Sequence, residues 1–211
     1  MSQAGQQATS EQDLRPPRRY SLITPTEWFR IPLRSQEKRE RSVRVLLDRT
    51  YPNRDEHAAR RRELRELLSG LVDRAAHRDG LELYLSTQAV LGVPVPASLL
   101  VLVEPENPAL PSQPPVELLA DGLRAKYGKQ AEVTTVRLPS GPSVRCRRQV
   151  LGEGALELGQ TADRPSTALD HYLPRPHSTA WLVLTFTTPI PELANAQVEM
   201  FDAIAASLQW S

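Results

Sequence analysis

The sequence is nearly free of cysteine: Cys146 is the only one among 211 residues. A single thiol cannot form a disulfide within the chain, nor can it build a thiolate zinc site alone. Residues 1–19 are polar and lack the apolar stretch of a signal peptide. No apolar run approaches the roughly 18 residues that a membrane-spanning helix needs. We therefore expect a protein of the reducing cytoplasm that does not insert into a membrane.

The short motifs of common enzymes are also missing. The sequence has no glycine-rich phosphate loop ending in Lys-Ser or Lys-Thr, no H-E-x-x-H, no G-x-S-x-G and no C-x-x-C. Residues 152–154 (GEG) match the first half of a dinucleotide fingerprint, but the third glycine is misplaced and no strand-to-helix context surrounds them. We interpret them as a loop. We expect no catalytic residue, no cofactor and no metal.

Neither sign of charge is in excess. The 26 Lys and Arg residues almost balance the 25 Asp and Glu residues, for a formal net charge of +1. No global field is therefore expected to draw in nucleic acid or an anionic membrane. The arginine-rich residues 60–65 lie among acidic residues, which favours a solvated, salt-bridged helix face over a nucleic-acid surface. Nineteen prolines, with many alanines and arginines, favour a GC-rich, actinobacterial genome.

The spacing of apolar residues predicts the secondary structure. Helices are predicted at 36–49, 55–77, 116–127 and 191–209, and strands at 27–33, 81–86, 98–103, 132–138, 143–151, 169–173 and 180–187. Ser35 is placed to cap the first helix. Leu81, Leu83 and Leu85 alternate with polar residues, which predicts one apolar and one polar face. Residues 98–103 are apolar at both alternating sets of positions, which predicts a strand covered on both faces.

Short turns join most of the predicted strands, so their sheet should be largely antiparallel. Helices at both ends of the strand series can cover both of its faces. We predict an α+β fold with a mostly antiparallel sheet of about six or seven strands and helices on both faces. Residues 1–22 should form a disordered tail, and residues 23–211 a single domain.

Three potential metal ligands gather in one part of the sequence. Asp170 and His171 precede a predicted turn and His177 follows its prolines, so the two histidines could face each other across a hairpin. A metal site needs three or more converging ligands, and we favour a polar hairpin end instead. Cys146 shares its strand parity with Val144, which indicates a buried, unreactive thiol rather than a nucleophile.

A small basic patch is predicted on one strand face. Arg145 and Arg147 share a parity, and Arg137 lies across the predicted hairpin. Such a patch would suit an acidic peptide or a phosphate, and the alternative is an ordinary exposed strand face. Arg148 interrupts the alternation, which suggests an edge or a bulge.

Residues 28–33 (WFRIPL), 185–189 (TFTTP) and 201–208 (FDAIAASL) resemble segments of uncharacterised actinobacterial proteins. With the strand series between them, the architecture is similar to the PsbP-like fold, an antiparallel sheet between helices. The resemblance covers about residues 25–210 and implies a binding or assembly factor rather than an enzyme. The PsbP-like group includes photosystem accessory subunits, a Ran-binding import factor and mycobacterial lipoproteins. The resemblance assigns no functional residue, and the chain lacks the signal and lipid-attachment cysteine of the lipoproteins.

We therefore expect a non-catalytic protein-binding or assembly module, whose partner is another protein of unknown identity. Self-association is left open, and there is no strong nucleic-acid signal. One alternative is a structural subunit of a larger secretion or injection assembly. Another is an enzyme whose site is assembled from scattered residues such as His171, Asp170 and Arg147.

Four residues are candidates for contact with the partner: Trp28, Tyr84, Arg145 and Arg147. Tyr84 lies on the polar parity of its strand and should be exposed, whereas Trp28 fits a half-buried strand position. The two arginines are the charged part of this predicted surface.

Overall fold

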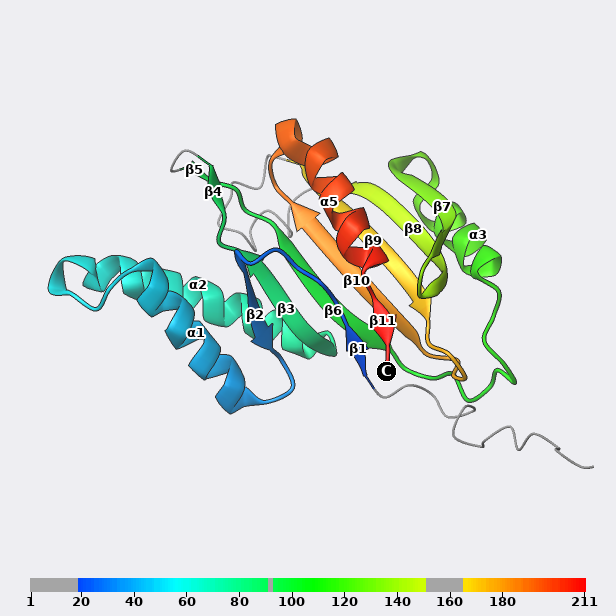
Figure 1. Ribbon diagram of the computed structural model, residues 1–211, viewed down its shortest axis with the longest axis horizontal. Helices are drawn as coiled ribbons and strands as arrows, with labels where there is room; N and C mark the ends of the chain where they lie inside the picture. The colour runs from blue at the N-terminus through cyan, green and yellow to red at the C-terminus, as the bar shows by residue number, and fades with distance from the viewer. Residues whose placement is uncertain (1–18, 91–92, 151–164) are drawn as a thin grey trace, which may run out of the picture.

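The computed structural model describes residues 19–90, 93–150 and 165–211. In this part of the chain, an antiparallel sheet of seven strands forms the centre of the molecule (Figure 1). In pairing order its strands are β2 (Trp28–Pro32), β3 (Gly80–Ser86), β6 (Ser98–Glu104), β10 (Trp181–Thr188), β9 (Ser166–Pro174), β8 (Gly141–Val150) and β7 (Ala131–Leu138). The predicted α+β class and the predicted strand number are confirmed.

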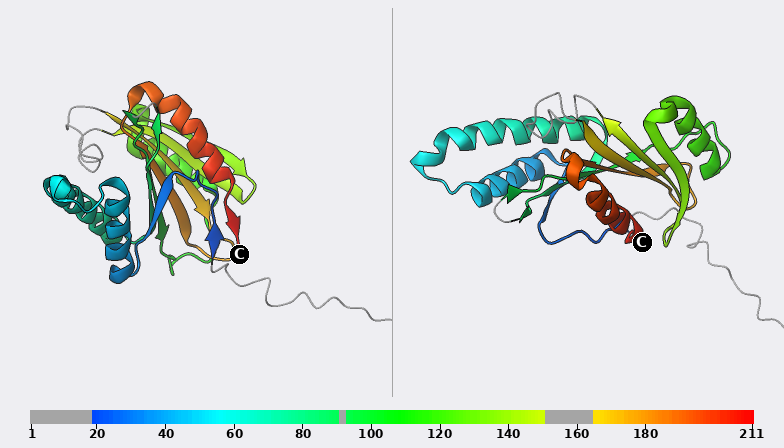
Figure 2. Two further views of the ribbon diagram at one scale, coloured as in Figure 1. Left: turned by 60° about the vertical axis from the view of Figure 1, so that its left-hand side comes forward. Right: turned by 90° about the horizontal axis from the view of Figure 1, so that it is seen from above.

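Helices cover both faces of the sheet, as predicted. They are α1 (Gln36–Thr50), α2 (Ala58–His77), α3 (Val116–Tyr127) and α5 (Ala194–Ala206), with short 3-10 segments η2 (Asp55–His57), η3 (Gly128–Gln130) and η4 (Pro191–Leu193). Helix α5 lies on one face, while α2 and α3 lie toward opposite ends of the other (Figures 1 and 2). We call these the α5 face and the α2/α3 face.

The α5 face carries a cluster of three aromatic side chains. Phe186 of β10 stacks on Phe201 of α5 with ring centroids 4.8 Å apart, and Trp28 meets Phe201 edge-on at 6.2 Å. All three side chains are buried. Trp28 is therefore a core residue, more deeply buried than its half-buried prediction.

Two separate clusters form on the α2/α3 face. One packs α1 and α2 against β2 and β3, and the other packs α3 against β7, β8 and β10. Leu99 and Val101 of β6 point to the α5 face, whereas Leu100 points to α2. The prediction that residues 98–103 are covered on both faces is confirmed.

Local signals place the helix ends. The Ser35 hydroxyl accepts a hydrogen bond from the Lys38 backbone N–H at 3.4 Å, which caps α1 as predicted. Gly128 follows α3 with a φ of 53°, a value that favours glycine. One residue of the arginine-rich helix departs from its prediction, because Arg61 is buried and pairs with Asp48 of α1 at 2.6 Å. The buried guanidinium holds α2 against α1.

A β-bulge in β3 overturns the predicted alternation of its leucines. Gly80 pairs with Leu102 and Glu82 with the next residue, Val101, so that Leu81 is an extra residue between them. Leu83 packs under the α1–α2 pair, but Leu81 packs against the cluster on the α5 face. Alternation alone would have put both leucines on one face.

The first and last strands of the described residues, which we call the chain ends, pair with each other. Strand β1 (Tyr20–Ser21) and strand β11 (Gln209–Trp210) form an antiparallel ribbon, visible as neighbouring blue and red arrows in Figure 1. Arg19 and Ser211 extend it with two backbone hydrogen bonds of 2.9 and 3.0 Å. This corrects two predictions: residues 19–22 belong to the fold rather than to a tail, and the last helix ends at Ala206 rather than at 209.

A small antiparallel ribbon of β4 (Ala89–Val90) and β5 (Val93–Pro94) forms outside the seven-stranded sheet. Three other expectations concern residues elsewhere in the chain. The rest of the predicted tail, residues 1–18, lies outside the described residues, and so do residues 152–154. Arg148 does not mark a bulge, because the register of β8 runs without a shift on both sides.

Candidate functional site: a basic groove beside the paired chain ends

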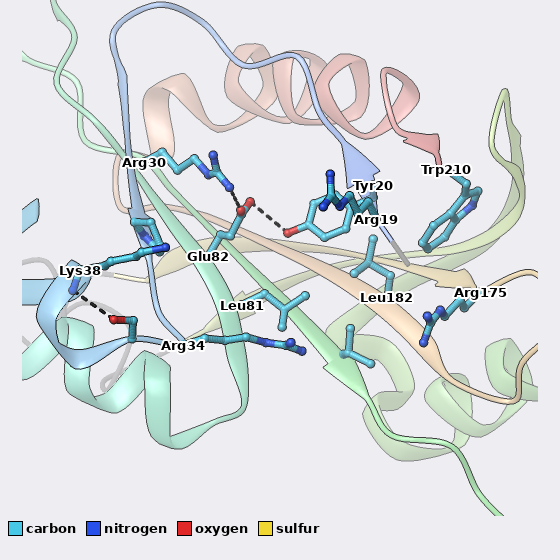
Figure 3. A pocket seen from close by; sticks show the side chains of 13 residues that line it. Arg19, Tyr20, Arg30, Arg34, Lys38, Leu81, Glu82, Arg175, Leu182 and Trp210 are labelled. Atoms are coloured by element: carbon cyan, nitrogen blue, oxygen red, sulfur yellow. Dashed lines mark hydrogen bonds and ion pairs between the residues drawn. The ribbon is translucent and has the colours of Figure 1, made fainter. Parts of the chain in front are cut away.

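A cavity of about 600 Å³ opens on the α5 face between the β1–β11 ribbon and the start of α1 (Figure 3). Its walls come from both chain ends, from β2 and from the first turn of α1, and its floor comes from β3, β6 and β10. We call it the basic groove. It is lined by Arg19, Tyr20, Arg30, Pro32, Arg34, Ser35, Lys38, Leu81, Glu82, Val103, Arg175, Leu182 and Trp210.

The floor of the groove is apolar. Leu182 and Val103 are paired across β10 and β6, and the bulge of β3 brings Leu81 beside them. Leu182 is almost fully buried, whereas Leu81 and Val103 keep part of their surface exposed. A ligand that covers exposed apolar surface at the bottom of a cavity removes it from water, and this favours binding.

The walls are cationic. Among the described lining residues, five carry a positive charge (Arg19, Arg30, Arg34, Lys38 and Arg175) and only Glu82 a negative one. Arg34 and Lys38 are exposed, and their side chains make no hydrogen bond or ion pair with another described residue. In Figure 3, Lys38 lies at one side of the groove and Arg34 reaches from that side to below Leu81, whereas Arg19 lies beside Tyr20 and Arg175 lies at the opposite side.

Glu82 is the centre of a hydrogen-bond network at the groove. Its carboxylate accepts hydrogen bonds from the Tyr20 hydroxyl at 3.0 Å and from the Tyr84 hydroxyl at 2.8 Å, and it pairs with Arg30. Burial and the bond to Glu82 raise the pKa of both tyrosines well above the usual range. The hydrogen bond to Glu82 also raises the pKa of Arg30. The single negative charge of the groove is thus compensated from within the protein.

Tyr84 does not reach the surface. Only 7% of it is exposed, which overturns the expected exposure of its parity. Tyr84 lies on the face of β3 that points toward α5, and this face is covered by the core cluster there. Tyr84 therefore lies behind the groove, where its hydroxyl donates a hydrogen bond to Glu82. Trp28, the other aromatic candidate, is buried in the core as described above.

Arg145 and Arg147 point to the α5 face, as their shared parity predicted, and there they meet α5. Arg145 binds both carboxylate oxygens of Asp202 at 2.9–3.2 Å, and Arg147 donates to Asn195 at 2.7 Å. Arg137 has the opposite parity in the β7–β8 register, so the three arginines do not form one patch. The pair Arg145 and Arg147 links the sheet to a helix.

The three potential metal ligands do not converge. His171 lies buried on the α5 face, with its Nε2 2.9 Å from an Asp202 oxygen. Asp170 points to the other face and accepts hydrogen bonds from Arg148 at 3.0 and 3.2 Å. His177 lies in the turn after β9 with a φ of 57°. The part of the chain that the structure describes holds no cluster of three or more potential ligands.

Two further groups have shifted acidities that fit structural roles. Burial, reinforced by the Asp170 carboxylate, raises the pKa of the Cys146 thiol to about 11, which agrees with the predicted buried and unreactive thiol. Burial works to raise the pKa of Asp202, but hydrogen bonds from His171 and Arg145 outweigh it and hold that pKa below its usual value. Asp202 is therefore an ionised anchor of α5.

Little in the sequence indicated that the groove residues would come together. Arg30, Arg34 and Lys38 recur at intervals of four across the predicted end of a strand and the start of a helix, a spacing that could have marked them. Arg19 fell in the predicted tail and Arg175 in a predicted turn. Nothing in their local sequence relates those two to the other three.

No family model matches the chain, and no curated protein matches it. A solved structure that is similar in arrangement is the solution structure of cyanobacterial PsbP (CyanoP) from Synechocystis sp. PCC 6803. The match covers 100% of this chain and 98% of that one, with 11% sequence identity and a TM-score of 0.46. No helix in the described ranges has the length and apolarity to span a bilayer.

Proposed function

We propose that this protein is a non-catalytic binding module that receives an acidic segment of a partner protein in the basic groove. The observation that carries the proposal is the imbalance of charge around the cavity, where five cationic side chains face a single carboxylate. Arginine and lysine in such a setting form charge-assisted hydrogen bonds with carboxylates. The proposal keeps the expected class of protein and moves its contact surface from the strand face to the groove.

The charges of Arg34 and Lys38 are available to a partner. Glu82 is already compensated by Arg30 and the two tyrosines, so it does not cancel Arg34 and Lys38. The whole chain carries a formal charge of only +1, so the attraction is confined to this surface. Exposed charges are screened beyond roughly 8 Å at physiological ionic strength, and binding should therefore weaken as salt is added.

The side chains around the groove support binding rather than chemistry. The raised pKa values of Tyr20 and Tyr84 keep both hydroxyls protonated at neutral pH, so neither offers a base. The cations can hold an anion but cannot accept a proton from it. We also propose a cytoplasmic location, supported by the composition of the chain and by its one free thiol, which is buried.

The first test is a charge reversal in the groove. The probe is a fluorescein-labelled peptide of two glutamates, a leucine and two glutamates, and its binding is followed by fluorescence anisotropy at low and physiological salt. Two exposed ion pairs contribute up to about 1 kcal/mol each, and reversal adds repulsion. We expect Arg34→Glu with Lys38→Glu to weaken binding by about tenfold or more.

The matched control makes the same change in charge elsewhere. Arg60 and Arg62 are exposed on α2, outside the groove, and Arg60→Glu with Arg62→Glu should leave the affinity within about twofold. Equal losses in both double variants would show general charge attraction and reject the groove. Tighter binding of a labelled ten-nucleotide oligothymidine than of the peptide would reject the protein partner.

A further inference from the structure

We infer that the partner segment carries an apolar side chain between two acidic ones, and that this apolar side chain seats on the floor of the basic groove. The inference rests on the proposed function and specifies its ligand. It follows from where the apolar and cationic parts of the groove lie relative to each other.

The floor lies between two groups of cations. In Figure 3, Leu81 and Leu182 occupy the middle of the groove, with Arg34 and Lys38 at one side and Arg175 at the other. An extended segment that crosses the groove would meet positive charge, then apolar surface, then positive charge. Its complement is an acidic residue, an apolar residue and another acidic residue in that order.

The position of Leu81 gives the floor its apolar character. Without the bulge, the alternation of β3 would turn Leu81 toward α2 together with Leu83. The bulge places it on the groove side instead, beside Val103, where both keep exposed surface. A bare anion such as phosphate would leave this surface in water, whereas a leucine-sized side chain would cover it.

The volume of the groove limits the length of the segment. About 600 Å³ lies within the range of cavities that enclose a drug-sized molecule. A few residues of an extended segment can occupy such a space. The recognised unit is therefore a short stretch with one apolar anchor, flanked by carboxylates that reach the two cationic sides.

The test compares peptides of related composition. The peptide with leucine between two pairs of glutamates is measured beside one with serine in place of leucine, and beside one with leucine moved to the end. Binding is read by fluorescence anisotropy at fixed salt. We expect the central leucine to bind about tenfold more tightly than either relative, a difference of about 1.4 kcal/mol.

A protein variant addresses the floor directly. Val103→Thr keeps the shape of the side chain and adds a hydroxyl, so it should weaken the leucine peptide and leave the serine peptide unchanged. Val45→Thr, at an exposed position of α1, is the matched control and should change neither. Circular dichroism and thermal unfolding of each variant establish that it is folded.

The outcomes separate the two proposals. If all acidic peptides bind equally and Arg34→Glu with Lys38→Glu abolishes them all, the acidic partner stands and the apolar anchor is rejected. If no acidic peptide binds, or inorganic phosphate displaces the leucine peptide as well as unlabelled peptide does, the proposed function itself is rejected. A central-leucine preference that Val103→Thr removes would establish the anchor.

Discussion

At the scale of single residues, Gly80 has the tightest steric surroundings among the glycines that the structure describes. A Cβ atom there would lie 2.5 Å from the Ala75 carbonyl oxygen and 2.6 Å from a methyl carbon of Leu33. Both neighbours are held, one by the backbone of α2 and the other by its burial in the core. The absence of a side chain at Gly80 lets the sheet approach α2 and lets the bulge form beside it.

We predict that Gly80→Ala destabilises the protein by about 1–3 kcal/mol, the range for overpacking a well-filled core. The measurement is urea unfolding followed by circular dichroism. Gly122→Ala is the matched control, because Gly122 lies within α3 with nothing within 4 Å of the added carbon. That change should instead stabilise by about 0.5–1 kcal/mol. A neutral Gly80→Ala would contradict the close approach.

At the scale of elements, polar pairs at the edge of the aromatic cluster hold α5 against the sheet. Asp202 of α5 binds Arg145 of β8 and His171 of β9, and Asn195 at the other end of the helix binds Arg147. Glu132 of β7 also lies 3.7 Å from Arg145. These contacts explain why two strand arginines that could form a binding patch are instead used within the fold.

We predict that Asp202→Asn lowers the free energy of unfolding at pH 7 by about 1–2 kcal/mol, allowing for the partly exposed carboxylate. Because the folded-state pKa of Asp202 is depressed, its stabilisation is present above the unfolded-state value of about 4 and is lost as the pH falls below it. Urea midpoints of both proteins between pH 7 and pH 2.5 should therefore converge in acid. A difference that stayed constant down to pH 2.5 would argue against an ionised Asp202 as the anchor.

At the scale of the whole molecule, the pairing of the chain ends completes the groove. Tyr20 and Trp210 line the cavity from β1 and β11, which pair with each other outside the seven-stranded sheet. Within the described residues each strand of this ribbon has only two residues, and the Arg19–Ser211 hydrogen bonds extend it. A ribbon this short is marginal by itself and depends on its packing against the sheet.

We predict that Ser211→Pro opens the ribbon, because proline removes the N–H that donates to the Arg19 carbonyl. Amide hydrogen exchange at residues 19–22 should accelerate about tenfold, and the acidic peptide should bind several-fold more weakly. Ser211→Ala keeps the N–H and should match the unchanged protein in both measurements. If both variants behaved alike, the ribbon would not support the groove wall.

Much of the fold could be predicted from the sequence because periodicity reports which side of an element is buried. The apolar positions of 98–103 predicted a strand covered on two faces, and Ser35 predicted the start of a helix, both as found. The failures lie where long-range contact overrides local pattern. Tyr84 was expected to be exposed because it alternates with the leucines of its strand. Nothing near it in the sequence shows that this face is covered by segments from elsewhere in the chain.

The candidate site depended on the tertiary structure almost entirely. Arg19, Arg34 and Arg175 belong to segments remote in the sequence, and only the antiparallel order of the sheet and the β1–β11 pairing bring them to one cavity. By itself the sequence determined the α+β class, most of the helices and strands, and the inert surroundings of Cys146, because each depends on local periodicity and burial. The groove was decided by the tertiary structure, because its charge and its apolar floor arise from a bulge and from pairing between distant segments.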